Sequence, residues 1–452
     1  MPLLMPPRIV PPAQPLGRIA FMKAFVRNPL QVLPRAAYEE DFVAFGSEKA
    51  PRAWVTSPAL IKAVLLDERD KFGKLTQIRL LGPLLGKGIL TSEGTEWKWQ
   101  RQAAAPMFRP QELAGFVPAF VRAAEDALAR WRARPPDAVH AIDDDMTRAT
   151  FDVVAATLLP SADEKFAATV QDSVRSLQRF GAWGILYASM NLPQWFPYPG
   201  MVAHARAVRT LRSTVMALVR ARHDDKDPPD DLMGRLIAAR DAETGRAMDD
   251  AQLVDNLLTF YLAGHETTAK ALTWTLYLLA RSPDWTGRLE REIERVTGGA
   301  AVRAEHVEKL AGVQQVIKES MRLYPPVPMM SRQAVADARI DGHLVRAGTS
   351  ILMPIYAIHR HARRWDHPDE FDPARFSLER ESAIPRYQYM PFGAGPRVCI
   401  GMSFAMMEAT VILATFLAHA RFALARSEEP VPVASVTLIP KGGMALKVSM
   451  KD

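Results

Sequence analysis

The chain contains a single cysteine, Cys399, among its 452 residues. One thiol excludes a disulfide framework, because each disulfide needs two cysteines. It also excludes zinc sites built from several cysteines and iron–sulfur clusters held by four. Cys399 is therefore either an inert buried side chain, the ordinary state of a lone cysteine, or a thiolate with one task.

Long apolar runs are absent as well. No stretch approaches the roughly 18 apolar residues of a membrane span, and prolines interrupt residues 1–20, which lack the basic start of a signal peptide. We therefore expect no membrane anchor and a cytoplasmic location. Because no repeat or Gly/Ser linker divides the chain, we expect a single domain over 1–452, with residues 1–45 as a Pro-rich N-terminal extension.

The formal net charge is +7. Basic residues are not clustered with aromatic residues as in nucleic-acid-binding proteins, so we expect no nucleic-acid partner. The excess charge is either an ordinary solvated surface or a face that docks an acidic electron-transfer protein.

Apolar periodicity predicts a mainly α-helical fold with a minor β-sheet. Asp249 and Asp250 offer an N-cap and Pro283 a stop, which enclose a helix long enough to cross the whole molecule. Further helices are expected over 146–159, 313–324 and 402–419, and short strands over 52–56 and 350–354.

The neighbours of Cys399 favour the reactive alternative. Gly393 and Gly395 allow the backbone to turn tightly beside a flat ligand. Arg397 places a permanent cation near the sulfur, suited to a carboxylate or to holding the thiolate. The helix expected over 402–419 directs its N-terminal dipole toward the same sulfur.

A polar segment, Ala-Gly-His-Glu-Thr-Thr over 263–268, interrupts the apolar pattern of the long helix. Gly264 costs about 1 kcal/mol against alanine inside a helix, and Thr267 can bond to a carbonyl of the preceding turn. The segment is either one solvent-exposed turn or a groove over a reactive centre, since departures from local rules gather at functional sites.

Two segments of the chain resemble motifs of cytochrome P-450 monooxygenases. Residues 392–401 match all five fixed positions of the haem-binding pattern Phe-x-x-Gly-x-Arg-x-Cys-x-Gly, and 263–268 resemble the oxygen-binding turn. The resemblance implies a cytochrome P-450-like fold with haem b between the long helix and the cysteine loop. It makes Cys399 the iron ligand, Thr267 the distal alcohol and Glu266 its acidic neighbour, a pair that can deliver the protons needed to cleave dioxygen.

The resemblance also assigns residues that contact the haem. Trp97 and Arg101 lie on one helical face, where two donors suit a carboxylate; an ordinary amphipathic surface is the alternative. The implied propionate ligands are Trp97, Arg101, Arg397 and, less closely matched, Arg332. The loop and turn beside the haem contribute Phe392, Gly393, Gly401, Ala263 and Gly264.

A structural network is implied as well. Glu319 and Arg322 are spaced i, i+3 ahead of Pro325, as in the family's Glu-x-x-Arg motif. Their partner would be Arg375 from the segment Pro-Ala-Arg-Phe, in which alanine stands where the family often has glutamate. We expect the three to support the haem loop.

The regions that would line the substrate pocket are apolar. Their composition favours a hydrophobic substrate of open identity, such as a terpenoid, fatty acid, steroid or aromatic compound. Arg79 or Arg179 could bind a substrate carboxylate, although an exposed arginine is the simpler interpretation. The candidate pocket residues are Leu84, Phe180, Trp183, Phe260, Val327, Met329 and Leu438.

Together these features predict a monomeric haem-thiolate monooxygenase that hydroxylates or epoxidises a hydrophobic substrate with O2. Electrons are expected from a separate ferredoxin and its NAD(P)H-dependent ferredoxin reductase. The alternatives are a peroxide-driven haem-thiolate peroxygenase or isomerase, a non-catalytic haem-binding sensor, and a helical interaction scaffold.

Overall fold

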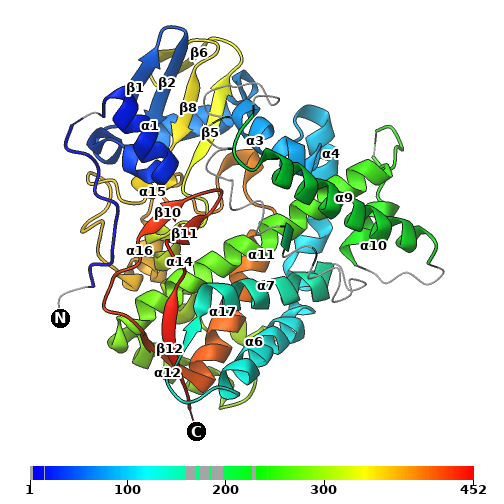
Figure 1. Ribbon diagram of the computed structural model, residues 1–452, viewed down its shortest axis with the longest axis vertical. Helices are drawn as coiled ribbons and strands as arrows, with labels where there is room; N and C mark the ends of the chain where they lie inside the picture. Colours follow the sequence, from blue (N-terminus) through cyan, green and yellow to red (C-terminus); the bar gives the residue numbers. More distant parts are fainter. Residues whose placement is uncertain are drawn as a thin grey trace.

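The computed structural model describes residues 4–14, 16–158, 197–225, 231–241 and 243–451, together with residues 169, 172, 173, 184 and 187. The described chain is mainly helical with small sheets, which confirms the predicted fold class. The principal sheet lies at one end of the molecule, and most of the longer helices are stacked beside and below it (Figure 1).

The helices and strands have the following bounds. The helices are α1 (Arg18–Arg27), α2 (Pro58–Lys62), α3 (Leu75–Leu85), α4 (Gly94–Ala104), α5 (Pro110–Ala114), α6 (Val117–Arg132), α7 (Ile142–Leu158), α9 (Met201–His223), α10 (Leu232–Ala238), α11 (Asp250–Ala280), α12 (Pro283–Thr297), α13 (Ala304–Val307), α14 (Ala311–Leu323), α15 (Ile355–Ile358), α16 (Leu378–Ser382) and α17 (Met402–His419). The strands are β1 (Phe42–Ser47), β2 (Ala50–Val55), β3 (Phe72–Gly73), β4 (Ala138–Ala141), β5 (Met330–Ala334), β6 (Ala338–Ile340), β7 (His343–Val345), β8 (Ser350–Met353), β9 (Ala420–Leu424), β10 (Pro432–Ala434), β11 (Leu438–Pro440) and β12 (Ala445–Met450).

Helix α11 runs through the centre of the molecule (Figure 1). Asp249 caps it as predicted: its side chain accepts from the backbone of Gln252, and the Gln252 side chain accepts from the backbone of Asp249, which completes a capping box. The helix ends at Ala280, shortly before Pro283 begins α12. Because α7, α9, α14 and α17 all pack against it, α11 is apolar on nearly every face.

Helix α17 occupies the predicted range 402–419 and lies in the same core. Its length and composition alone would allow it to cross a membrane, and it is the one helix of the described residues with that property. Most of its surface is buried inside the molecule, which accounts for its apolar composition by packing against α6, α11 and α14.

The principal sheet has the strand order β1-β2-β8-β5-β3. The predicted strands over 52–56 and 350–354 correspond to β2 and β8, which pair in parallel with Ala53 opposite Ile351. The next strand, β5, carries Arg332 opposite Ile351 on β8. The sheet therefore fixes the position of one of the predicted haem contacts.

The N-terminal segment contributes to the core. Ile9, Leu30 and Leu33 are buried there, and the Tyr324 hydroxyl of the core donates a hydrogen bond to the Pro7 carbonyl at 2.7 Å. The N-terminal segment that we expected as an extension, residues 1–45, thus contains residues that pack into the core.

The predicted network of Glu319, Arg322 and Arg375 is present. The side chains of Glu319 and Arg322 are fully buried on one face of α14. Arg322 donates from Nε to Glu319 Oε2 at 2.7 Å and from Nη2 to Oε1 at 2.8 Å, and Arg375 Nε lies 3.5 Å from Glu319 Oε1. Such a two-point pair satisfies both charges without water.

His359 extends this network to the cysteine loop. Arg322 Nη1 donates to the His359 carbonyl at 2.8 Å, and His359 Nε2 accepts from the Met390 backbone at 2.9 Å. Burial, together with the charge of Arg322, lowers the pKa of His359 to about 3, so its ring is neutral and free to accept. His359 is thus a structural link, a role that the sequence did not indicate.

We predict that Arg322→Gln lowers the free energy of unfolding by about 3–5 kcal/mol, because it leaves the buried Glu319 carboxylate without its partner. Urea unfolding followed by circular dichroism measures the effect. The matched control is Lys318→Gln on the same helix, whose ion pair with Glu381 is partly exposed and should contribute only about 0–1 kcal/mol. Equal effects of the two variants would contradict the structural role.

Candidate active site

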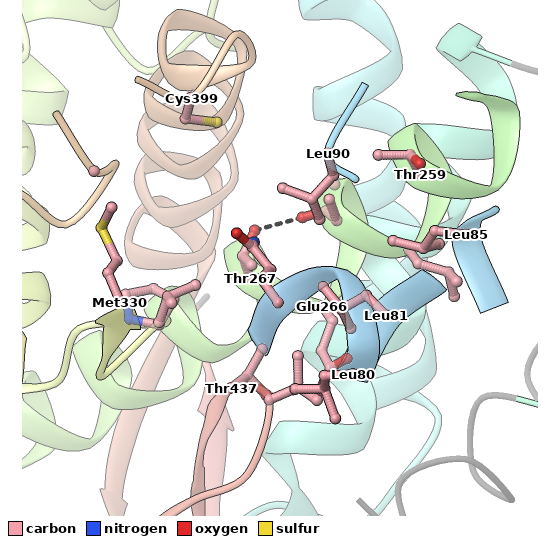
Figure 2. A pocket seen from close by; sticks show the side chains of 18 of the residues that line it. Leu80, Leu81, Leu85, Leu90, Thr259, Glu266, Thr267, Met330, Cys399 and Thr437 are labelled. Carbon is pink, nitrogen blue, oxygen red and sulfur yellow. Dashed lines mark hydrogen bonds between the residues drawn. The ribbon is translucent and has the colours of Figure 1, made fainter. Parts of the chain in front are cut away.

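A cavity of about 1270 Å³ lies between α11, the cysteine loop, the principal sheet and the turn between β10 and β11. Cys399 and Thr267 both line it and come from separate elements around the same space (Figure 2). The Cys399 side chain is accessible because it faces this cavity, although it lies deep in the molecule. The cavity therefore brings together the two segments that the sequence singled out.

Glycines shape the cysteine loop. Gly393 and Gly395 both have a φ of +71°, which side-chain-bearing residues rarely adopt. At Gly395 a Cβ would lie only 2.7 Å from the Leu65 carbonyl oxygen, so the loop approaches its neighbour too closely for any other residue. The Cys399 backbone N–H donates to the Phe392 carbonyl at 2.9 Å and closes the loop.

Burial raises the pKa of the Cys399 thiol, and two groups act against it: a backbone hydrogen bond at Gly401 and the charge of Arg101. The cation that favours the thiolate is therefore Arg101 on α4, which also donates to the Val398 carbonyl at 2.9 Å. Arg397, the cation expected from its nearness in sequence, instead places its guanidinium 3.8 Å from the centre of the Trp97 ring and donates to the Ser92 carbonyl.

Four cations gather on one side of the cavity: Lys74, Arg101, Arg332 and Arg397. Burial lowers the pKa of Arg332 and of Arg397 to about 10. Burial and the two arginines Arg397 and Arg332 together lower the pKa of Lys74 to about 7. The cluster therefore has more positive charge than its protein surroundings compensate, and it fits an anionic ligand such as the propionates of haem.

Trp97 lies on the same face of α4 as Arg101, a member of this cluster, as their spacing predicts. Lys74 was not predicted; its ammonium group donates to the Leu90 carbonyl. Nothing in its local sequence marks it, because its neighbours Arg332 and Arg397 are far along the chain. Phe392, Gly393, Gly401, Ala263 and Gly264 also line the cavity, as expected.

The polar segment of α11 faces the cavity and the core. Its carbonyls receive side-chain donors: Thr267 Oγ donates to the Ala263 carbonyl at 2.7 Å, and Thr150 Oγ of α7 donates to the His265 carbonyl at 2.8 Å. His265 itself is buried. The segment therefore borders the cavity, in agreement with a groove, and the reactive centre beside it stays a prediction.

Gly264 has a packing reason to be glycine. A Cβ there would lie 3.3 Å from Val154 Cγ2 on α7, tighter than ordinary contact. The small residue lets α7 approach the segment that carries Thr267.

The Glu266 carboxylate also lines the cavity, and it is the one carboxylate among the described residues that does so. The Thr437 hydroxyl donates to its Oε1 at 2.6 Å, and Figure 2 shows the two side chains together. Thr437 lies in the turn between β10 and β11, remote in sequence, so sequence analysis did not find it. The turn thus holds the acidic partner of Thr267.

Four of the predicted pocket residues line the cavity: Leu84, Phe260, Val327 and Met329. Leu438 does not: its side chain is in the core cluster, and its carbonyl accepts from Trp274 Nε1. The preceding residues Ser435, Val436 and Thr437 face the cavity instead, because the strand turns Leu438 inward. Phe180 and Trp183 lie outside the described residues.

Arg79 lines the cavity and is exposed. Within the part of the chain that is described, no three or more His, Cys, Asp or Glu side chains gather as they would around a metal ion. Cys399 is the one thiol of the chain, and it faces the cavity.

Comparisons with known proteins agree with this arrangement. The Cytochrome P450 family model matches residues 23–447. Cytokinin hydroxylase from Arabidopsis thaliana is 32% identical, with 92% of this chain and 82% of that protein aligned. Cyclooctat-9-en-7-ol 5-monooxygenase from Streptomyces melanosporofaciens is 32% identical over 88% and 86% of the two chains. The crystal structure of the cytochrome P450DA heme domain superposes with a TM-score of 0.84 at 25% identity, covering 98% of this chain and 99% of that one. The chain therefore belongs to the cytochrome P450 family and is a haem-thiolate cytochrome P450 monooxygenase.

Proposed function

We propose that Cys399 ligates the iron of haem b and that the enzyme inserts one oxygen atom from O2 into a hydrophobic organic substrate, by hydroxylation or epoxidation. The observation that carries the proposal is the position of the thiol and of the Glu266–Thr267 pair around one cavity. Cys399 supplies the one thiol of the chain, and a thiolate is the iron ligand of this family.

The residues around the cavity fit haem at both its centre and its edge. Cys399 would hold the iron, and Lys74, Arg101, Arg332 and Arg397 would bind the propionates, with the Trp97 indole beside them. When bound, the haem supplies the dioxygen-activating chemistry of the family. Glu93 compensates part of the charge of these cations, and the remaining positive charge is why we assign the propionates to the cluster.

Thr267 and Glu266 would handle protons. The Thr267 hydroxyl donates its hydrogen bond to the Ala263 carbonyl, so its oxygen can accept a hydrogen bond from a group in the cavity. The Glu266 carboxylate, held by Thr437, lines the same cavity and can pass a proton into it through a water molecule. Both groups are thereby fixed before a substrate arrives.

The substrate is proposed to be apolar over most of its length. Leu80, Leu81, Leu84, Phe260 and Val327 supply much of the cavity wall, and such walls favour hydrophobic ligands. By their names, two relatives act on a cytokinin and on cyclooctat-9-en-7-ol. Because the two named substrates differ, the relatives do not narrow the substrate of this enzyme further than a hydrophobic compound.

The electron donor is proposed to be a ferredoxin, reduced by an NAD(P)H-dependent ferredoxin reductase. Members of the family need redox partners. The net charge of +7 favours an acidic partner, because opposite charges speed encounter.

Thr267→Ala should lower product formation by about 10²-fold, the lower range for loss of a group that takes part in proton transfer, while O2 consumption continues and peroxide is released. Product and peroxide are measured with reduced ferredoxin as the electron source. The control is Thr259→Ala: Thr259 lines the same cavity and bonds to Asp255 in the same i, i−4 manner. Full turnover with added peroxide and none with reduced ferredoxin would contradict the proposal and favour a peroxygenase.

Thr437→Val removes the hydroxyl that holds Glu266 while it keeps the side chain's shape. A hydrogen bond to a charged group contributes about 1.5 kcal/mol or more, so the ratio of product to peroxide should fall by about tenfold. Ser435→Ala removes a hydroxyl from the same turn that makes no bond to Glu266 and should leave the ratio unchanged. Equal ratios in both variants would show that Thr437 does not position the acid.

A further inference from the structure

The cavity carries a second group of cations, separate from the four that we assign to the haem propionates. Three arginines form it: Arg79 on α3, and Arg209 and Arg212 on α9. Guanidinium groups beside a largely apolar cavity call for anions, supplied either by the protein or by a ligand. The acids near these arginines therefore decide which of them is available to a ligand.

Arg212 is neutralised within the protein. Its Nη2 lies 2.7 Å from Asp255 Oδ1 on α11, and its Nη1 donates to the Leu84 carbonyl of α3 at 3.1 Å. The Asp255 side chain is buried, and its other oxygen accepts from the Lys87 backbone at 2.7 Å. Arg212 therefore ties α9 to α3 and α11, and its charge is not free for a ligand.

Arg79 and Arg209 lack such a partner. Neither side chain forms a hydrogen bond or an ion pair with any other described residue. Their own helices offer no acid, because the sequences of α3 and α9 contain neither aspartate nor glutamate. The two positive charges therefore remain unpaired within the described chain.

Neighbouring elements do not supply the missing acids either. α3 packs mainly against β5 and α11, and α9 packs mainly against α11. β5 has no acidic residue, and α11 has three, each already held by another side chain. The pairs are Asp250 with His223, Asp255 with Arg212, and Glu266 with Thr437. No acid of these elements is therefore left for the two unpaired arginines.

Arg79 and Arg209 lie at the rim of the cavity. Both line it and both are exposed, so they stand where the cavity meets the solvent. Arg209 precedes Arg212 by about 4.5 Å along the axis of α9, and Arg79 precedes Leu84 by about 7.5 Å along α3, at about 1.5 Å per residue. Because Arg212 contacts Leu84, both rim arginines lie within two helical turns of one contact.

The same two helices present apolar side chains to the cavity. Leu80 and Leu84 of α3 line it, as does Val208 of α9. A ligand with an apolar body inside the cavity would therefore meet positive charge at its outer end. A carboxylate suits that end, because a planar guanidinium can bind both of its oxygens.

We propose that Arg79 and Arg209 bind the carboxylate of the substrate, so that the substrate is a hydrophobic carboxylic acid with its acid group at the rim. This inference rests on the proposed function, because it names the substrate class of the same cavity. Exposure keeps each contact weak, so the pair orients a substrate whose affinity comes mainly from the apolar wall. Oxidation then occurs far from the carboxyl group, because Cys399 lies deep in the molecule. Arg179, the other arginine considered for this role, lies outside the described residues.

Alkylimidazoles test the proposal without a known substrate, because an imidazole nitrogen can ligate haem iron and thereby shift the Soret band. Octyl-, dodecyl- and hexadecylimidazole are each compared with the same molecule carrying a terminal carboxylate. Both probes are titrated into the haem-loaded protein, and the ratio of their two Kd values is measured at each chain length. The length whose carboxylate reaches the rim should give the ratio most favourable to the acid.

At that length, Arg79→Gln and Arg209→Gln should each weaken binding of the carboxylate probe by about threefold, and the double variant by about tenfold, with the uncharged probe unchanged. The matched control is Arg206→Gln, which removes an exposed arginine of α9 that does not line the cavity. It should leave the ratio unchanged. Arg212→Gln should affect both probes alike, because Asp255 already neutralises that charge.

Salt gives a second measurement. Raising the ionic strength should reduce the advantage of the carboxylate probe in the wild type and have little effect in the double variant. A double variant with the wild-type ratio at every chain length would overturn the carboxylate site, as would an equal loss in Arg206→Gln. If none of the uncharged alkylimidazoles shifts the Soret band, the proposed function is refuted, and this inference falls with it.

Discussion

The rest of the site depends on the placement of one sulfur atom at the wall of an internal cavity. The Cys399 loop reaches this place because two glycines adopt positive φ angles and one of them lies against the Leu65 carbonyl. Arg101 holds the Val398 carbonyl from one side, and His359 holds the Met390 backbone from the other. His359 is in turn fixed by Arg322, so a buried ion pair distant from the cavity determines where the loop begins.

The cations that line the cavity leave an excess of positive charge that a bound anion would balance. Burial lowers the pKa values of Lys74, Arg332 and Arg397, and for Lys74 and Arg397 the neighbouring cations add to the effect. In the proposed assignment, the haem propionates would offset the excess positive charge. By linkage, the cofactor should also stabilise the fold, since it binds the folded chain and not the unfolded one.

Local patterns in the sequence predicted the parts of the fold that depend on neighbouring residues. The cap at Asp249, the extent of α17 and the i, i+3 pair of Glu319 and Arg322 follow from spacing along one helix. The cysteine loop and the polar segment of α11 could be found because each is a contiguous motif. Arg397 was expected to hold either a carboxylate or the thiolate, and only the structure shows that its guanidinium lies on the Trp97 ring.

Contacts between remote segments could not be predicted in this way. Lys74 and Thr437 each contact a partner that is remote in sequence, and their own neighbours in sequence give no sign of it. Leu438 was assigned to the pocket because its segment was identified correctly, but the register of β11 turns it into the core. Periodicity in the sequence thus predicts helices and strands, whereas only the folded structure shows which side chains of two such elements face each other.

The central claim is that Cys399 ligates the haem iron as a thiolate. Its most direct test is the visible spectrum of the reduced, CO-bound protein, compared between the wild type and Cys399→His. The account predicts the red-shifted Soret band of a thiolate ligand in the wild type, and a variant that still binds haem but has lost this band. Survival of the band in Cys399→His would show that another group ligates the iron and would contradict the account.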